Sequence, residues 1–330
     1  METPTTLPKP EALELPADPL EDATLRAAFA EPIGLREVAF EVAGRRVPAF
    51  ERRRFGLRQF ELGPLGLCAP ACPDEEAAQA LCVFLREAPQ LAVRVRVNLH
   101  PLEPHADVLQ GAARAAGYRV ESLQTHMLDL DRPLAQIRAG YHATKRAQVR
   151  RAVIASSVIA CTRERAALDA YFEVYAASAQ RWGRAGPPYP RALFEALLAS
   201  PCTQLWTHHV SGRLACAMVV LAGRSHALYW QGVSHIEPDQ KAAHPMARLL
   251  DAVVQHLHGQ GVARFNLGAS QGLPNVQRFK EEFGARPAQY VSLVHESRLW
   301  RLVAAVRHLR AAGAGPGAGT GVGRGAGTGG

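Results

Sequence analysis

Lys280 stands out among the residues that could do chemistry, because the chain has four lysines and writes most of its positive charge as arginine. It lies in the run Arg278-Phe279-Lys280-Glu281-Glu282-Phe283-Gly284. That run follows a strand-like pattern over 262–268 and a short loop, and it predicts a short helix that ends at the glycine. A lysine ammonium at the end of a strand could stabilise an oxyanion, as acyl transfer requires. An ordinary solvated helix lysine remains the alternative.

Other patterns argue against several kinds of site. The chain contains no Gly-x-Ser-x-Gly elbow, no Walker loop and no dinucleotide fingerprint. His208 and His209 would point to opposite faces of a strand, and His256 and His258 lie two apart on a predicted helix. We therefore expect no metal site. The six cysteines form no CxxC pair, which indicates reduced thiols of a cytoplasmic protein.

A basic stripe could bind a polyanion. The stretch from Leu134 to about Ile154 predicts one helix, and helical spacing puts Arg138, His142 and Lys145 on one side with Arg146 beside them. Such a stripe could hold phosphate groups or dock tRNA, although a solvated helix face is the commoner explanation. The net charge of +8 is compatible with an anionic partner.

The elements that must position these residues follow one order twice. Each half shows three short strands, then helices alternating with strands. In the first half we expect strands at 37–43, 46–52, 57–63, 91–99 and 119–129, with helices from Pro73-Asp74 to Glu87 and at 105–116. In the second half we expect strands at 203–210, 214–222, 225–233, 262–268 and 287–295, with helices at 244–259 and 275–283. The pattern predicts a mixed α/β fold, of the α+β kind, in two related halves.

The predicted organisation has five parts. Residues 1–33 read as a disordered leader and 311–330 as a disordered glycine-rich tail. Residues 34–132 form the first half, residues 133–296 the second, and 297–310 an amphipathic helix. That helix could lie on an anionic membrane, but packing against the last strand is commoner. No run is long and apolar enough to span a bilayer.

An ordered set of motifs runs through the second half. It comprises Arg184 before Pro187-Pro188-Tyr189-Pro190, the strand residues Tyr229-Trp230, then Lys241 and His244-Pro245, then Phe265-Asn266-Leu267-Gly268, and finally Phe279-Lys280. Over about 130–295 this set resembles the Fem-type acyltransferases of the GNAT superfamily. It is most similar to the acetyltransferase-like branch associated with envelope polysaccharide and peptidoglycan synthesis.

The resemblance implies two tandem GNAT-like halves, of which the second carries the activity and the first does not. It also implies transfer of an acyl group from an activated donor to an amine or hydroxyl of an anionic envelope precursor. By this resemblance Lys280 would stabilise the oxyanion. The donor would be bound by Phe279, Tyr229, Trp230, Lys241 and His244. The acceptor would be bound by Asn266, Lys145, Arg146 and Arg184.

Two departures from the family pattern leave the donor and acceptor open. Residues 241–247 lack the Gln/Arg-x-x-Gly-x-Gly/Ala loop that binds coenzyme A pyrophosphate. Acyl-CoA and aminoacyl-tRNA therefore both stand as donors, and we expect no tightly bound cofactor. The family usually has Asp where Asn266 stands, so acceptor binding there would be weaker. The alternative function is a catalytically silent scaffold that binds an anionic partner such as tRNA or a sugar phosphate.

Overall fold

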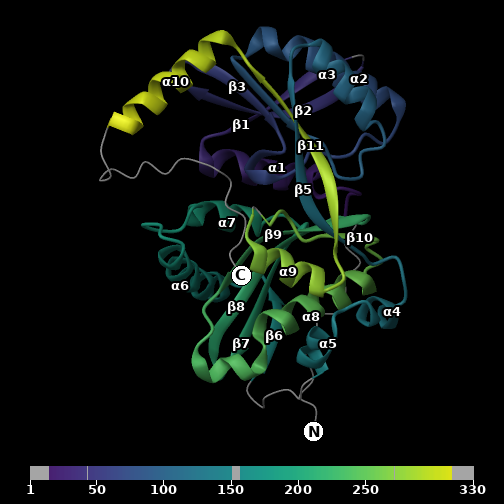
Figure 1. Cartoon of the computed structure of the whole chain (residues 1–330), viewed down its shortest axis with the longest axis vertical. Coiled ribbons are helices and arrows are strands. Elements are labelled where there is room, and N and C mark those ends of the chain that lie inside the picture. The colour runs from purple at the N-terminus through teal and green to yellow at the C-terminus, as the bar shows by residue number, and fades with distance from the viewer. Residues whose placement is uncertain (1–14, 43, 151–156, 271, 314–330) are drawn as a thin grey trace. The chain divides into compact units, whose positions relative to one another are not determined.

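The computed structural model describes residues 15–42, 44–150, 157–270 and 272–313, and these divide into two compact units (Figure 1). The larger unit contains the described residues 15–33 and 124–288, and the smaller unit contains 34–123 and 289–313. Helices pack on β strands in both units. The predicted mixed α/β fold in two halves is therefore confirmed.

The larger unit is built on strands in the order β5-β10-β9-β8-β7-β6. These are β5 (Arg119–Asp129, of which residues 124–129 belong here), β10 (Arg264–Asn266), β9 (His226–Ser234), β8 (Arg213–Ala222), β7 (Thr203–Val210) and β6 (Ser157–Thr162). Neighbours are antiparallel except β9 and β10, which are parallel. Strand β8 is buried almost along its whole length, because helices cover both of its faces.

The two helical layers of the larger unit contact different faces of β8. Helix α8 (Pro245–Gly259) packs on the side chains of Cys216, Met218 and Val220, whereas α6 (Arg165–Arg181) contacts β8 and β9 from the other side (Figure 1). The remaining helices of this unit are α1 (Ala23–Ala30), α4 (Leu134–Ala139), α5 (Ala143–Arg150), α7 (Arg191–Leu197), α9 (Pro274–Glu282) and the short 3₁₀ segments η1 (Pro19–Glu21), η2 (Glu31–Ile33) and η4 (Pro238–Ala243).

The smaller unit has the strand order β1-β2-β3-β4-β11. Its elements are β1 (Arg36–Val42), β2 (Arg45–Arg54), β3 (Leu57–Leu62), η3 (Pro64–Gly66), α2 (Glu75–Leu91), β4 (Arg94–Asn98), α3 (Ala106–Ala115), β11 (Arg286–Glu296, from residue 289 on) and α10 (Arg298–Gly313). Asp74 caps α2 by accepting a hydrogen bond from the Ala77 N–H, as the predicted helix start requires. The core joins Phe60, Val95 and Leu293 of the strands to Phe84 and Leu85 of α2.

The predicted leader and domain boundary differ from the structure. Residues 15–33 fold: Asp22 caps α1, and Leu25 and Phe29 are fully buried, so the disordered-leader prediction is wrong there. Residues 1–14 lie outside the described part. The predicted boundary between 132 and 133 also fails, because the long strands β5 and β11 each run from one unit into the other.

The prediction of a single helix from Leu134 to about Ile154 is also wrong. The chain turns after Gly140 between α4 and α5, where the His142 N–H donates to the Glu282 carbonyl over 2.7 Å. Residues 151–156 lie outside the described part, and β6, which the sequence did not predict, follows. The residues of the predicted basic stripe are therefore divided between α4, the turn and α5.

The amphipathic helix α10 does not pack in the predicted way. Five apolar residues were predicted on one side of it: Leu299, Leu302, Val303, Val306 and Leu309. Leu299, Leu302 and Val306 are exposed, Val303 is half-buried, and the Leu309 side chain lies outside the described part. Trp300 is buried instead, with the Arg94 guanidinium 5.8 Å from its ring centroid. The helix reaches Gly313, and the predicted disordered tail from 314 on lies outside the described part. Within the residues that the structure describes, no helix has the length and hydropathy needed to cross a bilayer.

Candidate active site

The Lys280 side chain is buried inside the larger unit, with 2% of its surface exposed. Its Nζ donates to the carbonyls of Gly268 (2.9 Å) and Ala269 (3.0 Å). Burial lowers the pKa of this ammonium from its ordinary 10.5 to about 8. The solvated-lysine alternative is thereby excluded. An ammonium has three N–H donors, and within the described residues two acceptors, both backbone carbonyls, meet them.

The carbonyls that hold Lys280 belong to the turn after β10. Gly268 has φ +77°, a conformation that glycine adopts without steric cost. The Asn266 Oδ1 accepts from the Gly268 N–H (2.8 Å) and from Thr125 Oγ1 (2.5 Å). Asn266, predicted to bind the acceptor, therefore lies in the turn that positions Lys280 and helps to shape it.

His126 on β5 belongs to the same site and was missed by the sequence analysis. It is 1% exposed, and its Nε2 lies 3.6 Å from Glu281 Oε1, too far for a hydrogen bond. Within the described residues, this Nε2 has no hydrogen-bond partner. Burial and the Lys280 charge lower the pKa of His126 in spite of Glu281, so the imidazole is neutral near pH 7. Only the pairing of β5 with β10 brings it here, since no sequence motif contains it.

Tyr229 and Trp230 lie where β9 loses its partner. The β9–β10 pairing stops at Leu228 and Asn266, directly before Tyr229. A register shift against β8 leaves Trp230 as the extra residue of a β-bulge. Both side chains are 8% exposed but contact different neighbours: Tyr229 joins the α8 core, and Trp230 stacks on Tyr189 with ring centroids 5.4 Å apart.

The structure places the other predicted donor residues at the start of α8. Lys241 is exposed in η4, and His244 links η4 to α8 with φ +45°. Within the part of the chain that the structure describes, no side-chain cap is found at this helix N-terminus, and the carbonyl of its first residue, Pro245, lies 2.9 Å from His208 Nδ1. Arg184, predicted to bind the acceptor, is exposed in the loop after α6. Among the described residues, no hydrogen bond or ion pair joins Lys241 or Arg184 to Lys280.

Phe279, Lys145 and Arg146 form a separate group. The Phe279 ring packs on Phe283 at 5.2 Å and lies 4.8 Å from Lys145 Nζ, which is also 3.3 Å from Glu282 Oε2. Arg146 donates to the carbonyls of Ala139 and Tyr141, at the end of α4. Because successive helix residues point about 100° apart, Phe279 faces a different side of α9 from Lys280.

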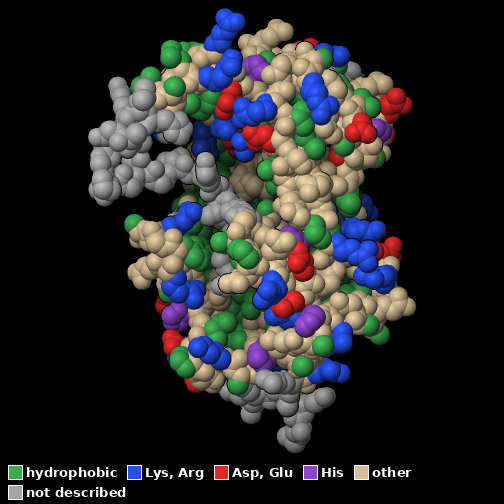
Figure 2. Space-filling model, in the orientation of Figure 1, with side chains coloured by type: hydrophobic (Ala, Val, Ile, Leu, Met, Phe, Trp, Pro, Cys, Tyr) green, Lys and Arg blue, Asp and Glu red, His purple; other side chains and the backbone are tan. Residues whose placement is uncertain are grey.

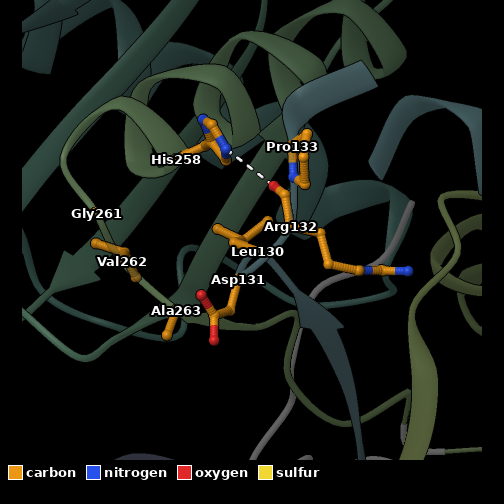
Figure 3. A pocket seen from close by; sticks show the side chains of 8 residues that line it. All are labelled: Leu130, Asp131, Arg132, Pro133, His258, Gly261, Val262 and Ala263. Carbon is orange, nitrogen blue, oxygen red and sulfur yellow. Dashed lines mark hydrogen bonds between the residues drawn. The ribbon is translucent and has the colours of Figure 1, made fainter. Parts of the chain in front are cut away.

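A surface pocket of about 350 Å³ lies at the other end of β10 (Figure 3). The Gly261-Val262-Ala263 segment before the strand and Leu130 to Pro133 line it, and His258 Nε2 lies 3.0 Å from the Arg132 carbonyl. Lys280 contacts the turn after the strand. The pocket is therefore distinct from the lysine site.

Comparison with known proteins identifies a domain family within the larger unit. The acetyltransferase (GNAT) domain family matches residues 136–281, which include Lys280, Asn266 and β9. No curated protein matches the chain by sequence.

Solved structures share the fold over most of the chain. FemX covers 82% of this chain and 92% of its own at a TM-score of 0.63 and 12% identity. The C-terminal domain of a putative lysylphosphatidylglycerol synthetase from Agrobacterium fabrum covers 87% and 91%, at a TM-score of 0.53 and 15% identity. The L-PGS of Bacillus licheniformis covers 87% and 95%, at 0.53 and 14%. Residues 136–281 therefore match an acetyltransferase (GNAT) domain, and the chain shares the FemX fold, with the buried Lys280 held at the turn after β10.

Proposed function

We propose that the protein transfers an acyl or aminoacyl group from an activated donor to an amine, or a hydroxyl, of an anionic cell-envelope precursor. The observation that carries this proposal is the buried Lys280 ammonium, which donates to two carbonyls and has no third hydrogen-bond partner among the described residues. Attack on an ester or thioester carbonyl places negative charge on its oxygen. A fixed ammonium in a water-excluded site stabilises that charge without reorganising.

The attacking amine must also lose a proton as the new C–N bond forms. His126 is neutral and lies beside Lys280, and the lone pair of a neutral imidazole can accept that proton. The Lys280 charge disfavours protonation of His126 before the reaction. As negative charge develops on the substrate oxygen, this obstacle is reduced. Lys280 and His126 would thus act in one step with opposite tasks. When the tetrahedral intermediate collapses, the C–O or C–S bond to the donor would break, and the protonated His126 would return its proton to the departing alcohol or thiol.

The donor would lie along β9 and the start of α8. From Tyr229 on, β9 has no β10 residue beside it, which leaves backbone groups for an extended donor chain. The uncapped α8 N-terminus and Lys241 would attract phosphate groups. Pro245 removes one N–H from this first turn, and no glycine-rich loop precedes it. Acyl-CoA and aminoacyl-tRNA therefore both remain donors to test.

The envelope assignment of the acceptor has support from the comparisons. The name lysylphosphatidylglycerol synthetase denotes a lysyl group joined to an anionic lipid, and that protein shares this fold. An anionic acceptor suits a chain of net charge +8. Asn266, Arg184, Lys145 and Arg146 are the residues proposed to meet it, of which Asn266 is closest in structure to the lysine turn.

The test is turnover by Lys280→Met and Lys280→Ala, with acetyl-CoA and aminoacyl-tRNA offered separately as donors and envelope amines as acceptors. Removal of an oxyanion donor should lower kcat by about 10²–10³-fold. Arg278→Met, which removes an exposed cation from the same helix, is the matched control and should keep full activity. Equal turnover by all variants would remove the role given to Lys280. Binding of tRNA that weakens steeply with salt, without turnover of any donor, would favour the silent scaffold.

A further inference from the structure

Helix α10 turns an apolar face to solvent. Leu299, Leu302 and Val306 are 49%, 63% and 41% exposed, and their spacing puts them on one side of the helix. Trp300 points elsewhere and is 8% exposed beside Arg94, so it anchors the helix to the smaller unit. The helix therefore exposes this apolar face even though Trp300 attaches it to the smaller unit.

Another exposed apolar side chain lies at the turn of the β2–β3 hairpin. Phe55 is 77% exposed, and it and Gly56 form a two-residue turn with φ of +53° and +74°. Phenylalanine in this conformation is strained, and exposure of its ring to water brings no compensation. The flanking sequence is Arg52-Arg53-Arg54-Phe55-Gly56-Leu57-Arg58, and the Arg54 guanidinium lies 5.5 Å from the ring centroid.

Backbone hydrogen bonds put both features at the same end of the smaller unit. The Val93 N–H donates (2.9 Å) to the carbonyl of Arg58, which lies one residue pair from the hairpin turn. The Ser297 N–H, directly before α10, donates to the Val93 carbonyl (2.9 Å). Strand β4 runs away from this end, from Arg94 to Asn98. The hairpin tip and the start of α10 are thus two neighbouring projections of one surface.

Arginines surround these apolar side chains. Arg298 and Arg301 are exposed on α10, and Arg53 and Arg54 stand at the hairpin. Among the described residues, no acidic side chain forms an ion pair with Arg54, Arg298 or Arg301. Figure 2 shows basic and hydrophobic side chains next to one another in the region where Figure 1 draws α10. We call Phe55, Leu299, Leu302 and Val306 with these four arginines the arginine–apolar surface.

We propose that the arginine–apolar surface docks the protein on an anionic lipid bilayer. Apolar side chains rimmed by arginine match the boundary between acyl chains and phosphate headgroups, where the rings and aliphatic groups leave water and the guanidinium groups meet phosphate. A second copy of the chain would bring like charges together. Nucleic acid would satisfy the arginines but would leave Leu299, Leu302 and Val306 without apolar partners. The proposal goes beyond the transferase function and does not depend on it.

The test is co-sedimentation of the full chain with vesicles of phosphatidylcholine alone and with vesicles that also contain the anionic lipid phosphatidylglycerol. We expect binding only to the anionic vesicles, weakened by salt. Leu299→Gln with Leu302→Gln should weaken it at least ten-fold, because each removes a buried aliphatic group. Phe55→Asn should weaken it too while relieving the strained turn. Arg298→Gln with Arg301→Gln should cost roughly five-fold per arginine.

The matched control is Val108→Gln. Val108 is 60% exposed in the first turn of α3, which follows the opposite end of β4, and its substitution should leave vesicle binding unchanged. Thermal unfolding of every variant shows whether it is folded. Equal binding to neutral and anionic vesicles, or equal effects of Val108→Gln and the α10 variants, would overturn the proposal. So would a dimer, detected by light scattering, that the α10 variants dissociate in the absence of any vesicle binding.

Discussion

At the scale of single residues, the burial of Lys280 decides both its charge and its use. A lysine at 2% exposure is rare because its ammonium loses hydration, and here two carbonyls replace only part of it. The cost appears as a pKa of about 8. The buried ammonium is poorly screened by water. Its electrostatic effect on a reacting oxygen is therefore larger than that of an exposed lysine.

Because the pKa of Lys280 is about 8, we expect activity and stability to change in opposite directions as the pH rises. The oxyanion role needs the protonated ammonium, so kcat should fall as the pH rises through about 8. Below pH 8 Lys280 is charged in both the folded and the unfolded chain, and the folded state bears the burial cost. Above about 10.5 it is neutral in both, and the cost is gone. The Lys280 contribution to the free energy of unfolding should therefore rise by about 3 kcal/mol between these values.

The measurement compares wild type with Lys280→Met. Chemical denaturation at a series of pH values should show the variant more stable near pH 7, with its advantage shrinking as the pH approaches 10. In parallel, the pH profile of kcat is recorded for the wild type. A stability difference that does not change with pH, or activity that persists to pH 10, would show that the lysine is not a buried titrating group.

At the scale of elements, the turn after β10 fixes the position of the Lys280 ammonium, because the carbonyls of this turn accept its hydrogen bonds. Gly268 lies close to the Tyr229 backbone: a Cβ at this position would be 3.3 Å from the Tyr229 carbonyl oxygen. The substitution Gly268→Ala therefore combines left-handed backbone strain, about 1–2 kcal/mol, with a contact that pushes the turn away from β9. We expect kcat to fall at least ten-fold, because the two carbonyls that hold Lys280 move.

Gly272→Ala provides the control for this prediction. Gly272 has almost the same φ, +75°, and a Cβ there would meet nothing within 4 Å. It should show a similar loss of stability in thermal denaturation but retain activity. If both variants lose activity equally, the effect comes from the conformation of the loop as a whole and not from the contact with Tyr229.

Much of this element level could be predicted from the sequence, and the exceptions have physical causes. The strand, turn and helix around Lys280 were predictable because a buried apolar run, a glycine-bearing loop and a helix-ending glycine are local signals. His126 was not, because it enters the site only through the antiparallel pairing of β5 with β10. The break at Gly140 was not predictable either, because the His142 N–H after it donates to the carbonyl of Glu282, which lies far along the chain.

At the scale of the whole molecule, the chain has two hydrophobic cores with different members, one around α8 and one around α2. Each core gathers aliphatic and aromatic side chains from the strands and helices of its own unit. The acetyltransferase domain match over 136–281, which includes Lys280, falls in the larger unit, and His126 belongs to the same unit. A change confined to the smaller unit should therefore alter its stability without altering the lysine site.

Glu51 provides such a change. Its carboxylate is 2% exposed on β2 and accepts hydrogen bonds from Arg36, Arg53 and Arg58. Although burial opposes ionisation, these three guanidinium groups lower the pKa of Glu51 to about 2. The stabilisation is fully present above the ordinary pKa of about 4.5 and is lost as the pH falls through 2. Replacement by an amide should cost about 1–3 kcal/mol near pH 7, because charge-assisted bonds become neutral ones.

Hydrogen exchange of Glu51→Gln locates that loss. Amides of β1, β2 and β3 should exchange faster near pH 7, while those of β7, β8 and α8 keep their wild-type protection, because the two sets of elements belong to different cores. Below about pH 3 the variant and the wild type should converge, since the Glu51 carboxylate is then progressively protonated. Glu41→Gln, at an exposed position of β1, should match wild type throughout. Equal loss of protection in both sets would instead show that the chain unfolds as one cooperative body, and the independence argued from the two cores would be wrong.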